Sequence, residues 1–217
     1  MSGFRIKTCV LGIVSTNCYI IYREGGSQAI IVDPADRPDR ILEECRKLGL
    51  NVSAVLLTHG HFDHITAAQN LRSETGCRVY GAEAEARLLK EPEMNLSCKM
   101  GRQKVSLIAD EEVKDGQMLT LLDWNWKVIA TPGHTAGSVC YYLKDEDVLI
   151  SGDTLFYESL GRTDLPTGNS GQIVSSICEK LFSLPDDTIV YPGHGDPTTI
   201  GHEKQCNPVV PYWRKQG

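Results

Sequence analysis

Short apolar runs separated by one amphipathic segment make up the first third of the chain. Residues 4–11, 17–22 and 29–33 are rich in β-branched and aromatic side chains, which predicts three strands. Residues 36–49 place apolar side chains at helical spacing and end at a glycine, which predicts a helix. This part of the chain is therefore expected to form hairpin strands followed by a strand and a helix.

The middle of the chain continues the alternation of strands and helices. The apolar periods predict, in order, a buried strand, a helix, a strand and a short helix over residues 52–60, 64–76, 77–82 and 83–90. Residues 91–104 follow neither period and contain Pro92 and Gly101. We expect this segment to be a surface loop and a candidate lid.

The second half is again built from strands and amphipathic helices. Its pattern predicts four strands, a long helix, a further strand and a short helical tail, over residues 117–122, 126–131, 138–143, 147–152, 170–184, 187–191 and after residue 201. No short-period repeat is present, so a solenoid is not expected. Two sheets with helices on their outer faces would bury these apolar surfaces, which predicts a layered α/β fold.

Composition and charge narrow the class of protein. The 217 residues include 41% hydrophobic and 23% charged residues and no linker-like stretch, so we expect a single globular domain over 1–217. The formal net charge of −6 argues against nucleic acid and favours a small-molecule substrate. No apolar run approaches the roughly 20 residues of a membrane span, and the first residues show no export signal. We therefore expect a cytoplasmic protein, monomeric or homodimeric.

The eight cysteines do not form a recognisable framework. No C-x-x-C pair occurs among them, and several lie in apolar strand candidates. In a protein without an export signal such residues are typically reduced thiols that pack as small apolar groups.

The segment HGHFDH, residues 59–64, holds three of the six histidines and an aspartate. Packing alone does not explain such a cluster, and it indicates metal binding. A metal-type side chain also follows directly after four apolar strand candidates: His59, His134, Asp153 and His194. Strand ends that are far apart in sequence meet at one edge of a sheet, so these side chains are expected to converge.

Side-chain alternation within the cluster suggests how the ligands divide. In an extended segment His59, His61 and Asp63 would share one face, whereas His64 would point elsewhere, as a second metal would require. The total is five imidazoles and two carboxylates: His59, His61, Asp63, His64, His134, Asp153 and His194. Seven ligands are too many for one metal and suit two, with a bridging carboxylate and open positions. His202, with Glu203 beside it, is expected to be an ordinary surface or core residue.

The segment THGHFDH resembles the T-H-x-H-x-D-H motif of the metallo-β-lactamase superfamily. VDP at residues 32–34, TPGHTAGS at 131–138, SGDTLF at 151–156 and YPGHG at 191–195 match its other motifs in order. This resemblance implies the four-layer αββα sandwich. It also implies that His59, His61 and His134 bind one divalent metal, that Asp63, His64 and His194 bind the other, and that Asp153 bridges them. Zinc is the first expectation, and iron and manganese accept the same donors.

Within the superfamily the chain is most similar to the glyoxalase II-like group, the hydroxyacylglutathione hydrolases and their short bacterial relatives. The motifs GDTLF, LGRTD and YPGHGDPTTIGHEKQCNP carry this resemblance, and the C-terminal helical glutathione-binding domain of full-length glyoxalase II is expected to be missing. The resemblance implies hydrolysis of a thioester, such as S-lactoylglutathione or a related acyl-thiol, by a metal-bridging hydroxide, with Asp63 and Asp153 as the catalytic residues. Arg162 is then a candidate for substrate binding, although a turn salt bridge with Asp164 is an equal alternative.

Two points stay open at this level. Asp33 either orients a ligand or caps the turn before Pro34. The alternative activity is a persulfide dioxygenase of the same fold, with one iron held by His59, His134 and Asp153. Secreted β-lactamases fit less well, because they have an export signal and usually a cysteine at the position of Asp153. Nucleic-acid-processing members need a basic surface, which this acidic chain lacks.

Overall fold

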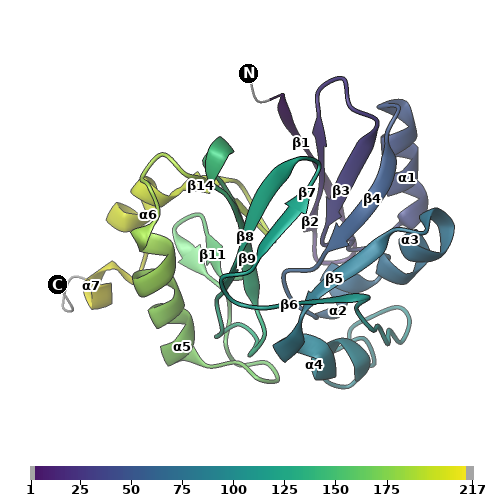
Figure 1. The fold of residues 1–217 in the computed structure, drawn as a ribbon. Coiled ribbons are helices and arrows are strands. Elements are labelled where there is room, and N and C mark those ends of the chain that lie inside the picture. Colours follow the sequence, from purple (N-terminus) through teal and green to yellow (C-terminus); the bar gives the residue numbers. More distant parts are fainter. Residues whose placement is uncertain (1–2, 214–217) are drawn as a thin grey trace.

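Two six-stranded sheets pack face to face in the computed structural model, which describes residues 3–213 (Figure 1). The first sheet has the strand order β1-β2-β3-β4-β5-β6. Its first three strands are antiparallel, and the pairs from β3 to β6 are parallel. The strands are β1 Phe4–Leu11, β2 Thr16–Arg23, β3 Gln28–Val32, β4 Asn51–Leu56, β5 Arg78–Ala82 and β6 Glu111–Val113.

The second sheet has the order β14-β13-β10-β9-β8-β7, and only its β10–β13 pair is parallel. A separate two-stranded hairpin, β11 Leu155–Phe156 and β12 Ser159–Leu160, follows β10. The six strands of the sheet are β7 Met118–Leu121, β8 Trp124–Ala130, β9 Val139–Leu143, β10 Val148–Gly152, β13 Ile189–Pro192 and β14 Thr198–Thr199.

Helices cover the outer face of each sheet (Figure 1). The α-helices are α1 Pro38–Lys47, α2 Phe62–Ile65, α3 Ala68–Thr75, α4 Ala86–Lys90, α5 Ser170–Ser175, α6 Ile200–Cys206 and α7 Val210–Trp213. Short 3-10 turns are η1 Glu83–Glu85, η2 Lys144–Glu146 and η4 Leu181–Ser183, and a π-helical turn, η3 Ser176–Lys180, continues α5.

Local sequence explains the bounds of α1. Pro38 lies in the first turn, where its missing N–H costs no helical hydrogen bond. Ile41 and Cys45, four residues apart, are buried on the same side. The chain leaves the helix through Gly49, which has a φ of 70°, a conformation that glycine adopts without steric cost.

Three apolar clusters fill the spaces between the layers. The central one lies between the sheets and includes Tyr19, Trp126 and Tyr141. A second cluster lies beneath α1 and α3, and a third lies beneath α5 and α6. The four-layer αββα sandwich expected from the sequence is confirmed.

Several local expectations were wrong. The helix expected over 64–76 is interrupted between α2 and α3, and that over 170–184 becomes a π-helical and then a 3-10 turn after α5. Strands β6, β11, β12 and β14 were not expected, because two or three residues show no alternation. Residues 91–104 are irregular as expected, but Asn95, Leu96 and Ser97 are buried, so the segment is not simply a surface loop.

The structure also bears on the expectations for the cysteines and for membrane-spanning helices. All eight cysteines lie within residues 3–213 and are free. Over the same described range, no helix has the length and apolarity needed to cross a membrane.

Removing the Tyr141 hydroxyl is expected to destabilise the packing between the sheets. This hydroxyl donates a 2.9 Å hydrogen bond to the carbonyl of Leu57 from a fully buried position. Tyr141→Phe leaves that carbonyl without its partner, so the free energy of unfolding should fall by about 1–3 kcal/mol in urea titrations. The exposed Tyr212→Phe is the control. Equal stability of the two variants would contradict the prediction.

Candidate metal centre

Four strand ends meet at one edge of the sandwich, as the sequence predicts. β4 ends at Leu56 and is followed by His59 and His61, and β8 ends at Ala130 shortly before His134. Asp153 comes directly after β10, and His194 follows β13. The rigid strands therefore bring side chains from across the chain into one cluster.

The first group of side chains that can hold a metal is His59, His61 and His134. Their ligating atoms lie within 4.8 Å of one another, and all three side chains are buried. Nδ1 of His61 lies 2.9 Å from Nε2 of His134. Three imidazoles at such distances, without a carboxylate among them, match one metal-binding group of the expected pair.

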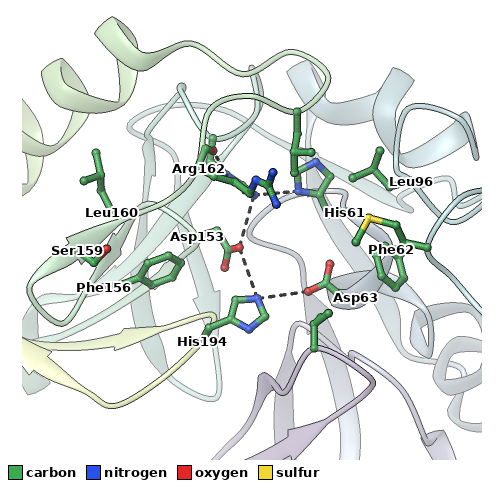
Figure 2. A pocket seen from close by; sticks show the side chains of 14 residues that line it. His61, Phe62, Asp63, Leu96, Asp153, Phe156, Ser159, Leu160, Arg162 and His194 are labelled. Atoms are coloured by element: carbon green, nitrogen blue, oxygen red, sulfur yellow. Dashed lines mark hydrogen bonds and ion pairs between the residues drawn. The ribbon is translucent and has the colours of Figure 1, made fainter.

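Asp63, His64 and His194 form a second group on the same 4.8 Å criterion. Asp153 lies between the two groups: its carboxylate oxygens are 3.4 Å from His64 Nε2, 3.5 Å from His134 Nε2 and 3.6 Å from His194 Nε2. Figure 2 shows Asp63, Asp153 and His194 pointing toward one another at the centre of the site. All seven predicted side chains are thus brought together.

Unpartnered polar atoms show that the site suits metal ions. The described side chains include six buried nitrogen or oxygen atoms without a hydrogen-bond partner, and four belong to this cluster: Nε2 of His59, His61 and His64, and Oδ1 of Asp153. Buried polar atoms are normally hydrogen-bonded, so a concentration of exceptions calls for an explanation. Lone pairs directed at bound cations supply that explanation.

Burial keeps the first group in the protonation state that a metal requires. Loss of solvent lowers the pKa of His59 and His134, and it lowers that of His61 to about 3. These imidazoles are therefore neutral near pH 7, and only a neutral imidazole nitrogen can bind a metal.

The second group carries the opposite electrostatic bias. Burial alone would lower the pKa of His64, but the carboxylates of Asp63, Asp153 and Asp33 outweigh it and raise that pKa. Burial likewise would raise the pKa of Asp63, yet nearby imidazoles, His64 first among them, lower it. Asp63 thus remains ionised and helps to create a site that attracts positive charge.

Hydrogen bonds on the far side of the His64 and His134 rings fix their orientation. Asp33 accepts from the Thr58 amide at 2.8 Å and from the Thr58 hydroxyl at 2.6 Å, and its Oδ2 lies 2.9 Å from Nδ1 of His64. The carbonyl of Arg162 lies 2.7 Å from Nδ1 of His134. Such contacts determine which ring nitrogen faces the metal. Asp33 therefore contacts His64, a candidate ligand, as the first of its two sequence interpretations expects.

One sequence argument about HGHFDH was wrong. It assumed an extended segment with His59, His61 and Asp63 on one face, but α2 begins at Phe62, so the second half of the motif is helical. The helical turn places Asp63 with His64 and His194 instead. The convergence of the seven candidate side chains was still expected correctly, because it depends on where the strands end and not on the backbone conformation inside the motif.

A cavity of about 370 Å³ opens onto the cluster. Figure 2 shows Phe156, Ser159 and Leu160 on one side of it and Phe62 and Leu96 on the other. Most of the lining outside the metal-type residues is therefore apolar.

Arg162 also lines this cavity. Its exposed guanidinium makes two 2.7 Å hydrogen bonds to Asp164, so the turn salt bridge considered in the sequence is present. The side chain nevertheless extends over the cavity beside His61 (Figure 2). Both sequence interpretations of Arg162 are therefore compatible with its position.

Sequence reasoning missed two residues that support the cluster. The hydroxyl of Thr16, at the start of β2, donates to Oδ2 of Asp63 at 2.8 Å. The buried carboxylate of Glu85 accepts the amide of Gly60 at 2.9 Å and also hydrogen-bonds Thr135, next to His134. Neither residue lies in a recognisable motif. The one sequence signal for Glu85 is its place shortly after β5, where other strands are followed by candidate ligands.

Comparison with known proteins places the chain in a family. A family model described as the metallo-beta-lactamase superfamily matches residues 11–194. Hydroxyacylglutathione hydrolase GloC of Haemophilus influenzae is 34% identical over 196 residues, which cover 89% of this chain and 92% of that protein.

Three solved structures resemble the fold closely. BLEG-1, a B3 metallo-beta-lactamase, has a TM-score of 0.90 at 38% identity and covers 95% of this chain and 99% of its own. TTHA1623 in a di-iron-bound form has a TM-score of 0.83 at 32% identity, and the match covers 93% of this chain and 98% of that one. ETHE1 from Myxococcus xanthus has a TM-score of 0.79 at 35% identity, and the match covers 94% of this chain and 83% of that one.

Glu85→Ala is expected to weaken metal binding although Glu85 is not a ligand candidate. Loss of the carboxylate removes the acceptor for the Gly60 amide between His59 and His61, so the first group should lose its geometry. We expect affinity to fall about 10- to 100-fold in competition with a chromophoric chelator. Glu85→Gln, whose amide oxygen can still accept that hydrogen bond, should restore part of the affinity.

The matched control is Glu83→Ala in the same 3-10 turn. Glu83 is exposed and pairs with Lys114 at 3.2 Å, away from the cluster. Equal affinities for Glu85→Ala and Glu83→Ala would show that Glu85 does not position the ligands.

Proposed function

The chain belongs to the metallo-beta-lactamase superfamily, and we propose that it is a metal-dependent hydrolase that cleaves a thioester such as S-lactoylglutathione or a related acyl-thiol. In this proposal His59, His61 and His134 hold one divalent ion, and Asp63, His64 and His194 hold the other. Asp153, which lies between the two groups, would face both ions. The observation that carries the proposal is the convergence of seven ligating side chains, four of whose buried atoms have no hydrogen-bond partner.

The ions would supply an acidified water as nucleophile and would polarise the substrate carbonyl. The chain itself contributes their placement and the surrounding charge. Asp63 and Asp153 provide the negative charge that retains the ions, Asp33 holds His64, and Thr16 holds Asp63.

The cavity lining favours a thioester over an amide. Apart from the proposed ligands, Ser159 and Arg162 are the only polar side chains among the described residues that line it. Neither is a general acid near neutral pH. An amide nitrogen must be protonated as it leaves, whereas a thiolate is stable enough to leave without a proton. The similarity to a hydroxyacylglutathione hydrolase supports the same substrate class.

The alternative is a persulfide dioxygenase with one iron on His59, His134 and Asp153. All three side chains are in the cluster, and the likeness to ETHE1 is a reason to test this activity. However, a single ion on this set leaves the buried Nε2 atoms of His61 and His64 without a partner. The two-ion proposal accounts for them, and a di-iron-bound neighbour shows that the fold can carry two metals.

Metal content and substrate preference, measured on one preparation, test the proposal. We expect two metal ions per chain by elemental analysis and turnover of S-lactoylglutathione or another thioester. Asp153→Ala should lose nearly all turnover and retain fewer ions, because its carboxylate faces both groups. One iron per chain with oxygen uptake on glutathione persulfide would favour the alternative. Cleavage of a β-lactam but no thioester would contradict both, as would wild-type turnover and metal content in Asp153→Ala.

Arg162→Ala should mainly raise KM for an anionic thioester. The variant removes the guanidinium from the cavity but keeps the backbone carbonyl that holds His134, so kcat should change little. Asp164→Asn is the matched variant: it removes the guanidinium's carboxylate partner and should lower KM. Initial-rate kinetics on both variants measure the effect. An unchanged KM in both variants would show that Arg162 only forms the turn salt bridge with Asp164 and does not bind substrate.

A further inference from the structure

A second set of metal-binding side chains lies outside the cavity. Glu158 is in the turn between β11 and β12, and His202 and Cys206 are on α6. The ligating oxygen, nitrogen and sulfur atoms of these residues all lie within 4.8 Å of one another. His202 and Cys206 are four residues apart, so they share one face of the helix.

Buried contacts fix the position of Glu158. Its φ of 50° is unusual for a residue other than glycine, and its amide donates to both carboxylate oxygens of Glu203 at 3.1 Å. Glu203 is fully buried and also accepts from the Thr198 hydroxyl at 2.6 Å and the Asn207 amide at 2.7 Å. The hairpin turn is therefore attached to α6 through a buried carboxylate, which keeps the Glu158 side chain against the helix.

The imidazole of His202 is also held in place. Its ring stacks on Tyr157, with ring centroids 5.0 Å apart and an interplanar angle of 13°. In this position Nε2 lies 3.0 Å from the Glu158 carboxylate. The side chains of Glu158 and His202 are 46% and 34% exposed, so a cation can reach them from solvent.

An ion pair between Glu158 and His202 does not account for the third member. Cys206 adds a thiol to an imidazole and a carboxylate, and these three donors are typical of Zn²⁺ sites. We propose that Glu158, His202 and Cys206 form a second metal site for a thiophilic divalent cation such as Zn²⁺, with water completing the coordination. This revises the sequence-based expectation for His202, whose partner Glu158 lies 44 positions away in the chain.

The place of this site gives it a structural consequence. Phe156, Ser159 and Leu160 of the same hairpin line the cavity (Figure 2). Tyr157 and Glu158 instead contact α6. A cation at the new site would therefore link the hairpin that forms one wall of the cavity to α6, on the side of the hairpin that faces away from the cavity. The site is independent of the proposed catalysis, because its three ligands are absent from the candidate metal centre.

Cobalt binding to the metal-loaded protein tests this proposal without relying on activity. The proposed catalytic ligands contain no sulfur, so a near-ultraviolet thiolate-to-Co²⁺ charge-transfer band reports only on a cysteine site. We expect Co²⁺ titration of the wild-type protein to produce this band and to saturate at one additional ion per chain. Cys206→Ser should abolish the band, and Glu158→Gln and His202→Ala should require higher Co²⁺ concentrations to produce it.

Cys98→Ser is the matched control. Cys98 is partly exposed, and its sulfur lies 3.4 Å from the Glu93 carboxylate, so it has an acidic neighbour but belongs to no three-donor group among the described residues. The band should persist in this variant. Absence of the band in the wild-type protein, or its persistence in Cys206→Ser, would overturn the proposal and show that Glu158 and His202 form an ion pair alone.

Discussion

The geometry of the metal centre depends on the hydrogen bonds that Asp33 accepts at the end of β3. Its two oxygens take the amide and hydroxyl of Thr58, and one of them also faces His64. The carbonyl of Thr58 accepts the amide of Val139, so the same residue joins the first sheet to β9 of the second. Gly152 packs so closely on Thr58 that a Cβ there would lie 2.4 Å from its hydroxyl oxygen. The strand ends that carry ligands are thus held together by contacts that exist before any metal binds.

This arrangement brings several imidazoles and carboxylates together in a buried site with little access to water. The imidazoles of the first group remain neutral because burial disfavours their charged form, whereas His64 is surrounded by carboxylates that favour it. In the absence of metal the second group is therefore held together by attraction between imidazole and carboxylate. Divalent ions would take over that role and would also satisfy the unpartnered nitrogens of the first group. The cluster is consequently better explained by metal binding than by folding stability, since buried groups without partners are destabilising.

The layered fold and the convergence of the seven candidate ligands could be predicted because both depend on local patterns. Apolar runs mark strands, and a metal-type residue after each run marks the shared edge of the sheets. The division of the ligands could not be predicted in the same way, because α2 begins inside HGHFDH and is stabilised by distant contacts, such as that of the Phe62 amide with the Asn95 carbonyl. Glu85 escaped notice for a related reason: its partner, Gly60, lies 25 positions away in the chain. Residues that act by supporting a ligand carry little local signal.

The same distinction explains why substrate identity is harder to infer than reaction class. Most of the candidate ligands lie shortly after the end of a strand, but the walls of the cavity come largely from irregular segments. Leu96 lies in residues 91–104 with a φ of 69° and is buried, and the β11–β12 hairpin depends on Glu203 in α6 for its turn. Such conformations are determined by long-range contacts and are free to differ between relatives that share every ligand. Within one superfamily, the reaction can therefore stay constant at the strand ends while selectivity changes in the segments that surround them.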